Sequence, residues 1–199
     1  MAALQNPIAP TRKSGRRAPR QGALTIALAC LFVLSTASAF AASAGEYQVK
    51  AAFLYNFARF VDWPNRSGAT ASVTICILGD DPFGGDINVI VGKPVGDRKL
   101  QVRRLASASG AADCQILFVS GSESPDLGRA LGAIKGRPVL TVADTPGFAE
   151  RGVVINLYVD QGKVRFEINV DAAKRAQLDI SSQLLKLARI TKDKGGANG

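Results

Sequence analysis

Three short apolar runs constrain the fold of this chain most strongly, because each of them has the character of a buried strand. They are Val73–Gly79, Asp113–Ser120 and Arg137–Ala143. Near-continuous apolar runs of this length are typical of strands that are covered on both faces of a sheet. The runs alternate with segments of helical pattern, and the order strand, helix, strand predicts a mainly parallel sheet covered by helices.

The segments between these runs are predicted to contain two helices and a further strand. A short helix is expected over 84–91. A second helix begins with Ser124 as N-cap and Pro125 at its first position, and it ends near Gly136. Lys99–Leu105 alternates polar and apolar residues, as an edge or half-buried strand does.

The C-terminal part of the chain predicts a hairpin followed by a helix. Val153–Val159 and Lys163–Asn169 flank Asp160-Gln161-Gly162, a typical hairpin turn. From Val170 the chain is expected to be helical. The later apolar stripe of that helix consists of Ile180, Leu184, Leu187 and Ala188. The sequence therefore predicts one compact Rossmann-like α/β domain over 45–192, with a late antiparallel hairpin, and a flexible tail over 193–199.

An aromatic-rich helix is predicted over 46–62, and Pro64 ends it. Its apolar stripe consists of Val49, Phe53, Phe57 and Phe60, and Leu54 and Val61 widen it. Such a stripe is expected to pack on the sheet. The other aromatic and charged side chains of this segment are better suited to a partner surface. We therefore predict partner-binding roles for Tyr47, Tyr55, Arg59 and Trp63.

The first forty-four residues have the three-part order of a secretory signal peptide. A basic stretch ends at Arg20, an uncharged apolar run spans Ala23–Leu34, and small residues follow. Cleavage after Ala39 and cleavage after Ala44 fit equally well. An uncleaved anchor over 23–42 and a lipoprotein signal at Cys30 remain weaker alternatives.

The net charge of +9 does not indicate nucleic-acid binding, because five positive charges lie in the leader. The remaining +4 is ordinary for a soluble domain. The only basic cluster of note beyond the leader is Arg98, Lys99, Arg103 and Arg104. Positive side chains protect exposed sheet edges from pairing, so a solvated edge strand explains this cluster better than a nucleic-acid site does.

Several catalytic classes are excluded by residues that the chain lacks. It has no histidine, which removes histidine-dependent triads and histidine zinc sites. It also has no G-x-x-x-x-G-K-[ST] phosphate loop. The second buried run ends in Ser120 where a phosphoacceptor receiver domain would carry aspartate. We therefore predict no catalytic residues, no metal site and no cofactor.

Three loops should meet at the carboxyl edge of the parallel sheet, which is where ligands bind in such folds. They are Asp80–Gly84, Ser120–Ser124 and Asp144–Phe148. A periplasmic small-ligand sensor could use their polar side chains. The candidate ligand-binding residues are Asp80, Asp81, Ser120 and Asp144. Ordinary turn geometry is the competing explanation, because aspartate and glycine are common in turns.

Cys76 and Cys114 each lie in a run that is expected to be buried. An exported chain folds in an oxidising compartment, which favours a disulfide between them over two buried thiols. Their 38-residue spacing does not match the C-x-x-C motif of oxidoreductases.

Segments along nearly the whole mature chain carry a resemblance to a known family. They are the Tyr47–Leu54 run, Asn56-Phe57, the Phe60–Pro64 run, the Ile75–Gly84 run, the Cys114–Ser120 run, the Pro138–Val142 run, the Val164–Asn169 run and the Ser181–Ala188 run. In this order and combination they resemble the YfiR-like family of periplasmic regulators.

The resemblance implies a non-enzymatic periplasmic α/β protein that binds the periplasmic part of an inner-membrane diguanylate cyclase. Binding would hold the cyclase inactive and lower cyclic-di-GMP. An outer-membrane lipoprotein would sequester the repressor, and homodimers are also implied. Cys76 and Cys114 match one family disulfide. A second family disulfide would fall within Thr145–Ile155, where this chain has no cysteine.

Overall fold

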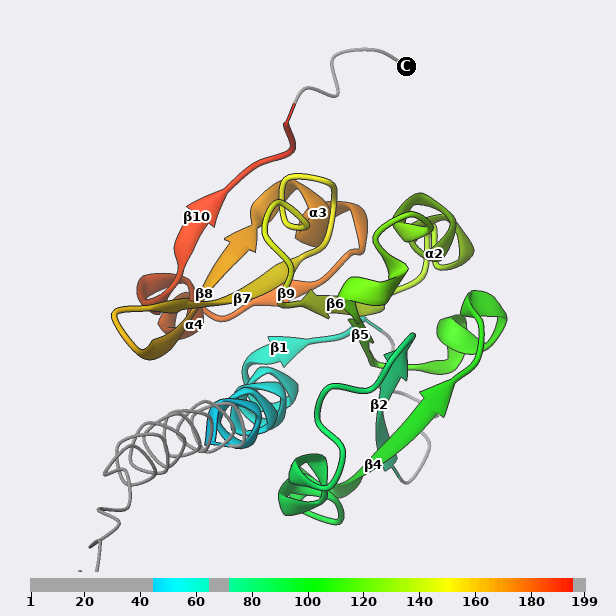
Figure 1. The fold of residues 1–199 in the computed structure, drawn as a ribbon, viewed down its shortest axis with the longest axis vertical. Coiled ribbons are helices and arrows are strands. Elements are labelled where there is room, and N and C mark those ends of the chain that lie inside the picture. The colour runs from blue at the N-terminus through cyan, green and yellow to red at the C-terminus, as the bar shows by residue number, and fades with distance from the viewer. Residues whose placement is uncertain (1–44, 65–71, 195–199) are drawn as a thin grey trace, which may run out of the picture. The chain divides into compact units, whose positions relative to one another are not determined.

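Eight strands form the main sheet of the part of the chain that this computed structural model describes, residues 45–64 and 72–194. Their order across the sheet is β10-β8-β7-β6-β5-β2-β4-β3 (Figure 1). In chain order they are β2 (Ser72–Leu78), β3 (Pro94–Val95), β4 (Arg98–Leu105), β5 (Ile116–Val119), β6 (Leu140–Ala143), β7 (Ile155–Asp160), β8 (Lys163–Asn169) and β10 (Arg189–Thr191). The five adjacent strands β4, β2, β5, β6 and β7 run parallel to one another. Strand β8 pairs antiparallel with β7. The mainly parallel sheet and the late hairpin are thus confirmed.

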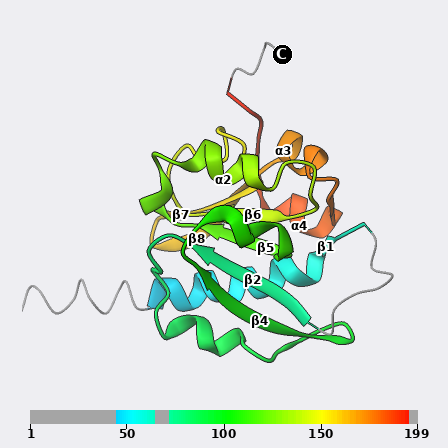
Figure 2. The same ribbon diagram turned by 90° about the vertical axis from the view of Figure 1, so that its right-hand side faces the viewer.

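Helices cover both faces of this sheet. Residues 45–60 are helical on one face, and α2 and α3 lie on the other side of strands β5 to β8 (Figure 2). The α-helices after residue 60 are α2 (Leu127–Ala133), α3 (Val170–Arg175) and α4 (Ser182–Leu187). Three 3-10 helices are η1 (Asp86–Ile90), η2 (Ala108–Asp113) and η3 (Gly121–Glu123). A small second sheet pairs β1 (Val61–Asp62) with β9 (Asp179–Ile180).

The alternation of side chains along the central strands produces two apolar cores. Ile75 and Ile77 of β2 belong to the core beneath the helix of residues 45–60, whereas Leu78 belongs to the core beneath α2. On β5, Phe118 faces the first core and Leu117 the second. Successive residues of a strand point to opposite faces, so a strand covered on both sides must be apolar throughout.

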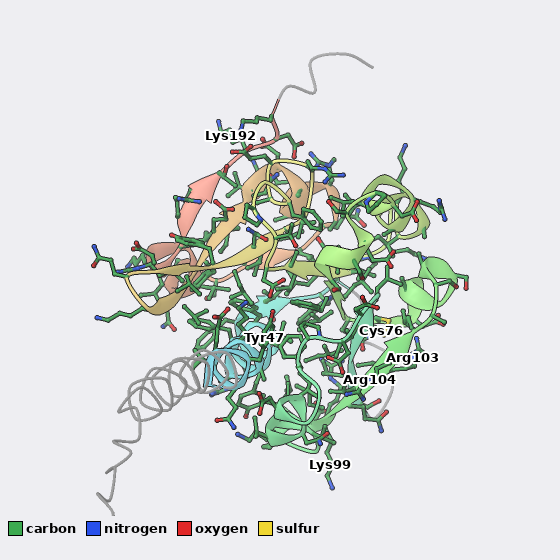
Figure 3. All side chains as sticks on the ribbon, in the orientation of Figure 1. Tyr47, Cys76, Lys99, Arg103, Arg104 and Lys192 are labelled. Atoms are coloured by element: carbon green, nitrogen blue, oxygen red, sulfur yellow. A yellow bond between two sulfur atoms is a disulfide. The ribbon has the colours of Figure 1, made fainter. Side chains whose placement is uncertain are left out.

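The predicted disulfide between Cys76 and Cys114 is present. It lies in the α2-side core and ties β2 to the residue at the C-terminal end of η2. Both cysteines are buried, and Arg103 of β4 extends over this region, where its guanidinium lies 3.5 Å from Cys114 Sγ. Figure 3 shows Arg103 and Arg104 on β4, beside the strand that carries Cys76.

Most of the apolar stripe predicted for the N-terminal helix is buried, but Val49 is not. Val49, placed in the apolar stripe by the sequence, is 45% exposed, whereas Leu54, Phe57 and Val61 are fully buried. Lys50 also lies on the buried face. A spacing of four, three and four residues places these four side chains on one stripe. Lys50 can occupy this buried stripe because it pairs with Asp144, and hydropathy alone does not reveal that partner.

Two predictions for the later helices were wrong. Ser124 does not cap α2, because the chain first forms η3, and the N-cap residue is Asp126. The single helix expected from Val170 is instead α3, β9, α4 and β10. Gln177 adopts a positive φ of 55° after α3, and residues 189–191 pair with β8. Leu187, predicted in a buried stripe, is 76% exposed.

The packed domain extends two residues into the segment expected to be a tail. Asp193 forms an ion pair with Arg175 and accepts a hydrogen bond from Asn169 Nδ2 at 2.7 Å. Lys194 pairs with Glu150. The predicted signal peptide and residues 195–199 lie outside the described residues. Within the described ranges, no helix is both long and apolar enough to cross a bilayer.

Candidate functional site

The three predicted loops do meet at the carboxyl edge of the sheet. The backbone N–H of Asp80 donates to Ser122 Oγ at 2.9 Å, which joins the first loop to the second. A Cβ built on Gly121 would lie 3.0 Å from Thr145 Oγ1, so the second and third loops also touch. The order β2, β5, β6 in the sheet explains this sequence of contacts.

A polar cluster lies between these loops and the N-terminal helix, and it comprises the buried Lys50 and the half-buried Glu46, Tyr47 and Asp144. We call it the Lys50 cluster. Lys50 Nζ lies 2.7 Å from Asp144 Oδ2 and 2.6 Å from Glu46 Oε1. Tyr47 donates its hydroxyl proton to the same Asp144 oxygen at 3.0 Å. The cluster therefore brings together two predicted site residues from different sets, Tyr47 and Asp144.

The environment of the Lys50 cluster changes the proton affinity of two of its members. Burial raises the pKa of Tyr47 above its ordinary value, and the negative charge of Asp144 raises it further. For Lys50, burial acts to lower the pKa, but the hydrogen bonds to Asp144 and Glu46 outweigh it and raise the pKa. Both groups are therefore held in their protonated forms, as donors to Asp144.

The other predicted ligand-binding residues have partners within the protein. Asp81 accepts from the backbone N–H of Phe83 at 2.8 Å and from Arg104 Nε at 2.6 Å. Ser120 is buried, and its backbone N–H donates to the carbonyl of Leu78 at 3.0 Å. Asp80 contributes only its backbone N–H to the contact with Ser122. The binding of a ligand by these loops stays a prediction.

Lys50 and Glu46 also belong to this site, although neither was predicted from the sequence. A signal for Lys50 was present, since it occupies the same helical stripe as Leu54, Phe57 and Val61. A lysine in a buried stripe requires an acidic partner, because an unpaired buried charge is costly. The identity of that partner could not be read from the sequence, since Asp144 lies 94 residues away.

A second group of side chains lies on the accessible side of the N-terminal helix. We call it the Tyr55 cluster, and it comprises Tyr55, Arg59, Phe60 and Lys93. Arg59 is exposed and lies 5.7 Å from the centre of the Tyr55 ring, and Lys93 Nζ lies 5.4 Å from it. The Tyr55 hydroxyl donates to the carbonyl of Pro94 at 2.9 Å. This arrangement places two cations near one aromatic ring, whose hydroxyl is held by a hydrogen bond.

The structure does not place Trp63 with this surface group. Only 9% of its surface is exposed, and its Nε1–H donates to the carbonyl of Gln115 at 3.2 Å. The side chain of Gln115 in turn accepts from the backbone N–H of Thr74 at 2.8 Å. Trp63 therefore anchors the end of the helix to β2 and β5, and little of its ring remains for a partner.

These features define a small disulfide-bonded α/β domain with helices on both faces of a mainly parallel sheet. The chain belongs to the YfiR/HmsC-like family, which it matches over residues 47–189. Members of this family are periplasmic regulators of diguanylate cyclases rather than enzymes. The resemblance seen in the sequence is thereby confirmed. No curated protein matches the chain.

Two solved structures show partial likeness. One is described as the ABC domain in complex with L-Trp from Streptococcus pneumonia, with 11% identity and a TM-score of 0.44. It is matched over 60% of this chain and 55% of its own length. The other is a conserved domain protein from Vibrio cholerae O1 biovar El Tor, with 13% identity and a TM-score of 0.46. It is matched over 63% of this chain and 56% of its own length, so the chain spans just over half of each.

Proposed function

We propose that this protein binds the periplasmic part of an inner-membrane diguanylate cyclase and holds it inactive, which lowers cyclic-di-GMP. The observation that carries this proposal is the family match over residues 47–189, which spans the described domain almost completely. The protein acts by docking and not by turnover. The signal peptide predicted over 1–44 directs its export to the periplasm and is removed by cleavage.

The Tyr55 cluster is the docking surface that the geometry supports best. Tyrosine and arginine are the residue types that most often dominate the energy of an interface. The Tyr55 ring is already held by its hydrogen bond to Pro94, so little side-chain entropy is lost when a partner covers it. The two cations, Arg59 and Lys93, favour a partner surface that carries acidic side chains.

The Lys50 cluster supports this docking role indirectly. Its ion pair fixes the N-terminal helix to the loop after β6, so the helix presents Tyr55 and Arg59 from a rigid base. A homodimer and release of the cyclase by an outer-membrane lipoprotein belong to the same proposal. Both rest on the family relationship.

The test is a binding experiment with membranes that contain the cyclase. The exported protein should be retained by these membranes, and the double variant Tyr55→Ala/Arg59→Glu should lose about tenfold or more in affinity, as expected for removal of interface anchors. Arg129→Glu is the matched control, because Arg129 is an exposed arginine on the opposite face of the sheet. Equal retention of both variants would show that the docking surface lies elsewhere.

The cyclic-di-GMP level in cells tests the repression itself, independently of which surface binds the cyclase. Deletion of the gene should raise cyclic-di-GMP, and expression of the unaltered protein should restore the lower level. If deletion leaves cyclic-di-GMP unchanged, the proposed repression is wrong, whichever surface binds membranes.

A further inference from the structure

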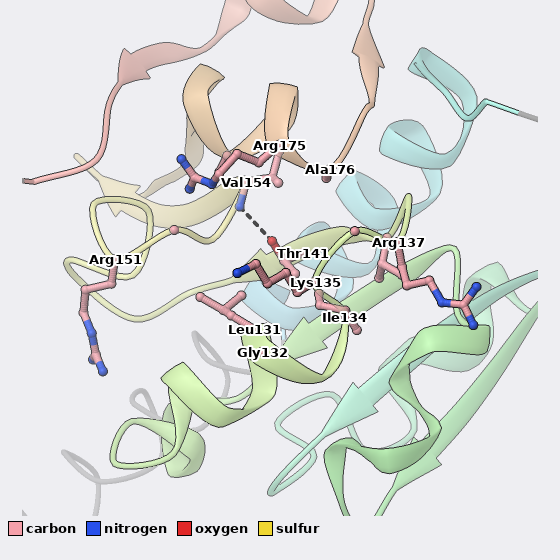
Figure 4. A pocket seen from close by; sticks show the side chains of 14 residues that line it. Leu131, Gly132, Ile134, Lys135, Arg137, Thr141, Arg151, Val154, Arg175 and Ala176 are labelled. Carbon is pink, nitrogen blue, oxygen red and sulfur yellow. Dashed lines mark hydrogen bonds between the residues drawn. The ribbon is translucent and has the colours of Figure 1, made fainter. Parts of the chain in front are cut away.

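A cavity of about 520 Å³ lies away from the loops of the predicted ligand site (Figure 4). It is formed by the C-terminal end of α2, the start of β6, the segment that precedes β7, and α3. Because β6 and β7 are parallel, this places the cavity toward their amino ends, whereas the predicted ligand loops follow the carboxyl ends of the strands. A volume of this size suits a small organic ligand.

The wall of the cavity is largely apolar. The apolar side chains that line it are Leu131, Ile134, Val139, Val154, Ala172 and Ala176. The hydroxyl of Thr141 also lines it, but this oxygen already accepts a hydrogen bond from the backbone N–H of Val154 at 2.8 Å. The wall therefore favours the apolar part of a ligand.

The charged side chains that line the cavity are all positive. Lys135, Arg137, Arg151 and Arg175 line it, and no aspartate or glutamate does so among the described residues. In Figure 4, Lys135 and Arg175 reach across the cavity, while Arg137 and Arg151 extend away from it on opposite sides. Arg175 is paired with Asp193, and no ion pair involves Lys135 within the described part of the chain. Of the two cations that reach across the cavity, Lys135 is therefore the one whose charge is available to a ligand.

We propose that this cavity binds a small amphipathic anion, a carboxylate attached to a short hydrocarbon chain or ring. The hydrocarbon occupies the apolar wall between α2 and α3, and the carboxylate lies against Lys135. An apolar wall combined with cations of one sign distinguishes this class of ligand from inorganic anions and from apolar amines. The inference concerns a site separate from the Tyr55 cluster, and it does not depend on the proposed repression of a cyclase.

Calorimetric titration of the exported protein with three probes tests the ligand class. The probes are octanoate, octylammonium and inorganic phosphate. Octanoate should bind with one site per chain and about tenfold or more tightly than the other two, because it alone combines the hydrocarbon with a negative charge. Absence of octanoate binding, or equal binding of octanoate and octylammonium, would overturn the proposal.

Two glycines of α2 provide a matched pair of variants that locates the bound probe. Gly132 lines the cavity and Gly128 does not, and a Cβ at either position would meet nothing within 4 Å. Both substitutions by leucine should preserve the helix, since leucine is a better helix former than glycine. Gly132→Leu should weaken octanoate binding about tenfold by filling the cavity, whereas Gly128→Leu should leave it unchanged. Unchanged binding by folded Gly132→Leu would place octanoate elsewhere and overturn the site.

A second pair of variants tests the charge. Lys135→Gln should weaken octanoate binding about threefold, a modest factor because the lysine is exposed to solvent. Lys99→Gln is the control, because Lys99 lies on β4 (Figure 3). In the sheet order, β4 is next to the edge strand β3 and away from β6 and β7, which border the cavity. Equal affinity of the two variants would overturn the role of Lys135.

Discussion

Lys50 Nζ lies 2.7 Å from Asp144 Oδ2, and the two side chains are 5% and 9% exposed. This ion pair joins the N-terminal helix to the loop that follows β6. Tyr47 donates a hydrogen bond to the same carboxylate oxygen, and Lys50 Nζ lies 4.4 Å from the centre of the Tyr47 ring. A residue predicted to bind a partner and a residue predicted to bind a ligand therefore belong to one internal cluster.

Replacement of Lys50 by methionine should destabilise the domain strongly. The change leaves the Asp144 carboxylate buried without its cation, which typically costs about 3–5 kcal/mol. The double variant Lys50→Met/Asp144→Leu should be much less destabilised than the sum of the two single variants. Urea unfolding of all three proteins measures this coupling, and strictly additive losses would show that the ion pair contributes little.

The domain should lose stability at alkaline pH through Tyr47 and Lys50. The pKa of each group is raised above its ordinary value, 10.0 for tyrosine and 10.5 for lysine, so the folded state binds these protons more tightly than the unfolded chain does. Their contribution is complete below about pH 10 and declines as the pH rises through the raised pKa values. Unfolding free energies from pH 8 upward should therefore fall less steeply for Tyr47→Phe than for the unaltered protein. Identical slopes would contradict the assignment to Tyr47.

Removal of the disulfide should lower stability substantially but leave the fold recognisable. Cys76 and Cys114 are 38 residues apart, and a cross-link of this spacing stabilises by about 4 kcal/mol in the chain-entropy description. The double variant Cys76→Ala/Cys114→Ala should show that loss in urea unfolding, with a circular dichroism spectrum close to that of the unaltered protein. Mass mapping under non-reducing conditions provides the direct check, and free thiols at both positions would remove the basis of this prediction.

Trp63→Phe should affect stability more than partner binding. The substitution keeps most of the buried ring and removes the hydrogen bond to the Gln115 carbonyl, which should cost about 1 kcal/mol. Membrane retention of the folded variant should match that of the unaltered protein. If the variant were as stable as the unaltered protein but were retained less by the membranes, Trp63 would belong to the docking surface.

The sheet could be predicted from the sequence because its strands carry their own signal. Three apolar runs became β2, β5 and β6, and Lys163–Asn169 matched β8 at both ends. The hairpin turn was also predictable, since Gln161 and Gly162 both adopt positive φ angles that glycine-containing turns favour. The local sequence pattern was sufficient to predict a strand wherever the strand is buried on both faces, because such a strand must be apolar throughout.

The C-terminal segment and the Lys50 cluster could not be predicted in the same way, because tertiary contacts decide them. Residues 189–191 have a helical pattern but pair with β8, where Arg189 donates to the buried Glu167 at 3.1 Å. Asn169 ends β8 and caps α3 by accepting from the backbone N–H groups of Asp171 and Ala172. The hydropathy pattern of a segment does not reveal such partners when they lie elsewhere in the sequence.

Cyclic-di-GMP synthesis by cyclase-containing membranes, measured with and without the purified exported protein, tests the central claim most directly. Synthesis should fall as the unaltered protein is added, and Arg129→Glu should have the same effect. Tyr55→Ala/Arg59→Glu should inhibit only at about tenfold higher concentration. A rate of synthesis that stays constant at every concentration of the unaltered protein would contradict the central claim.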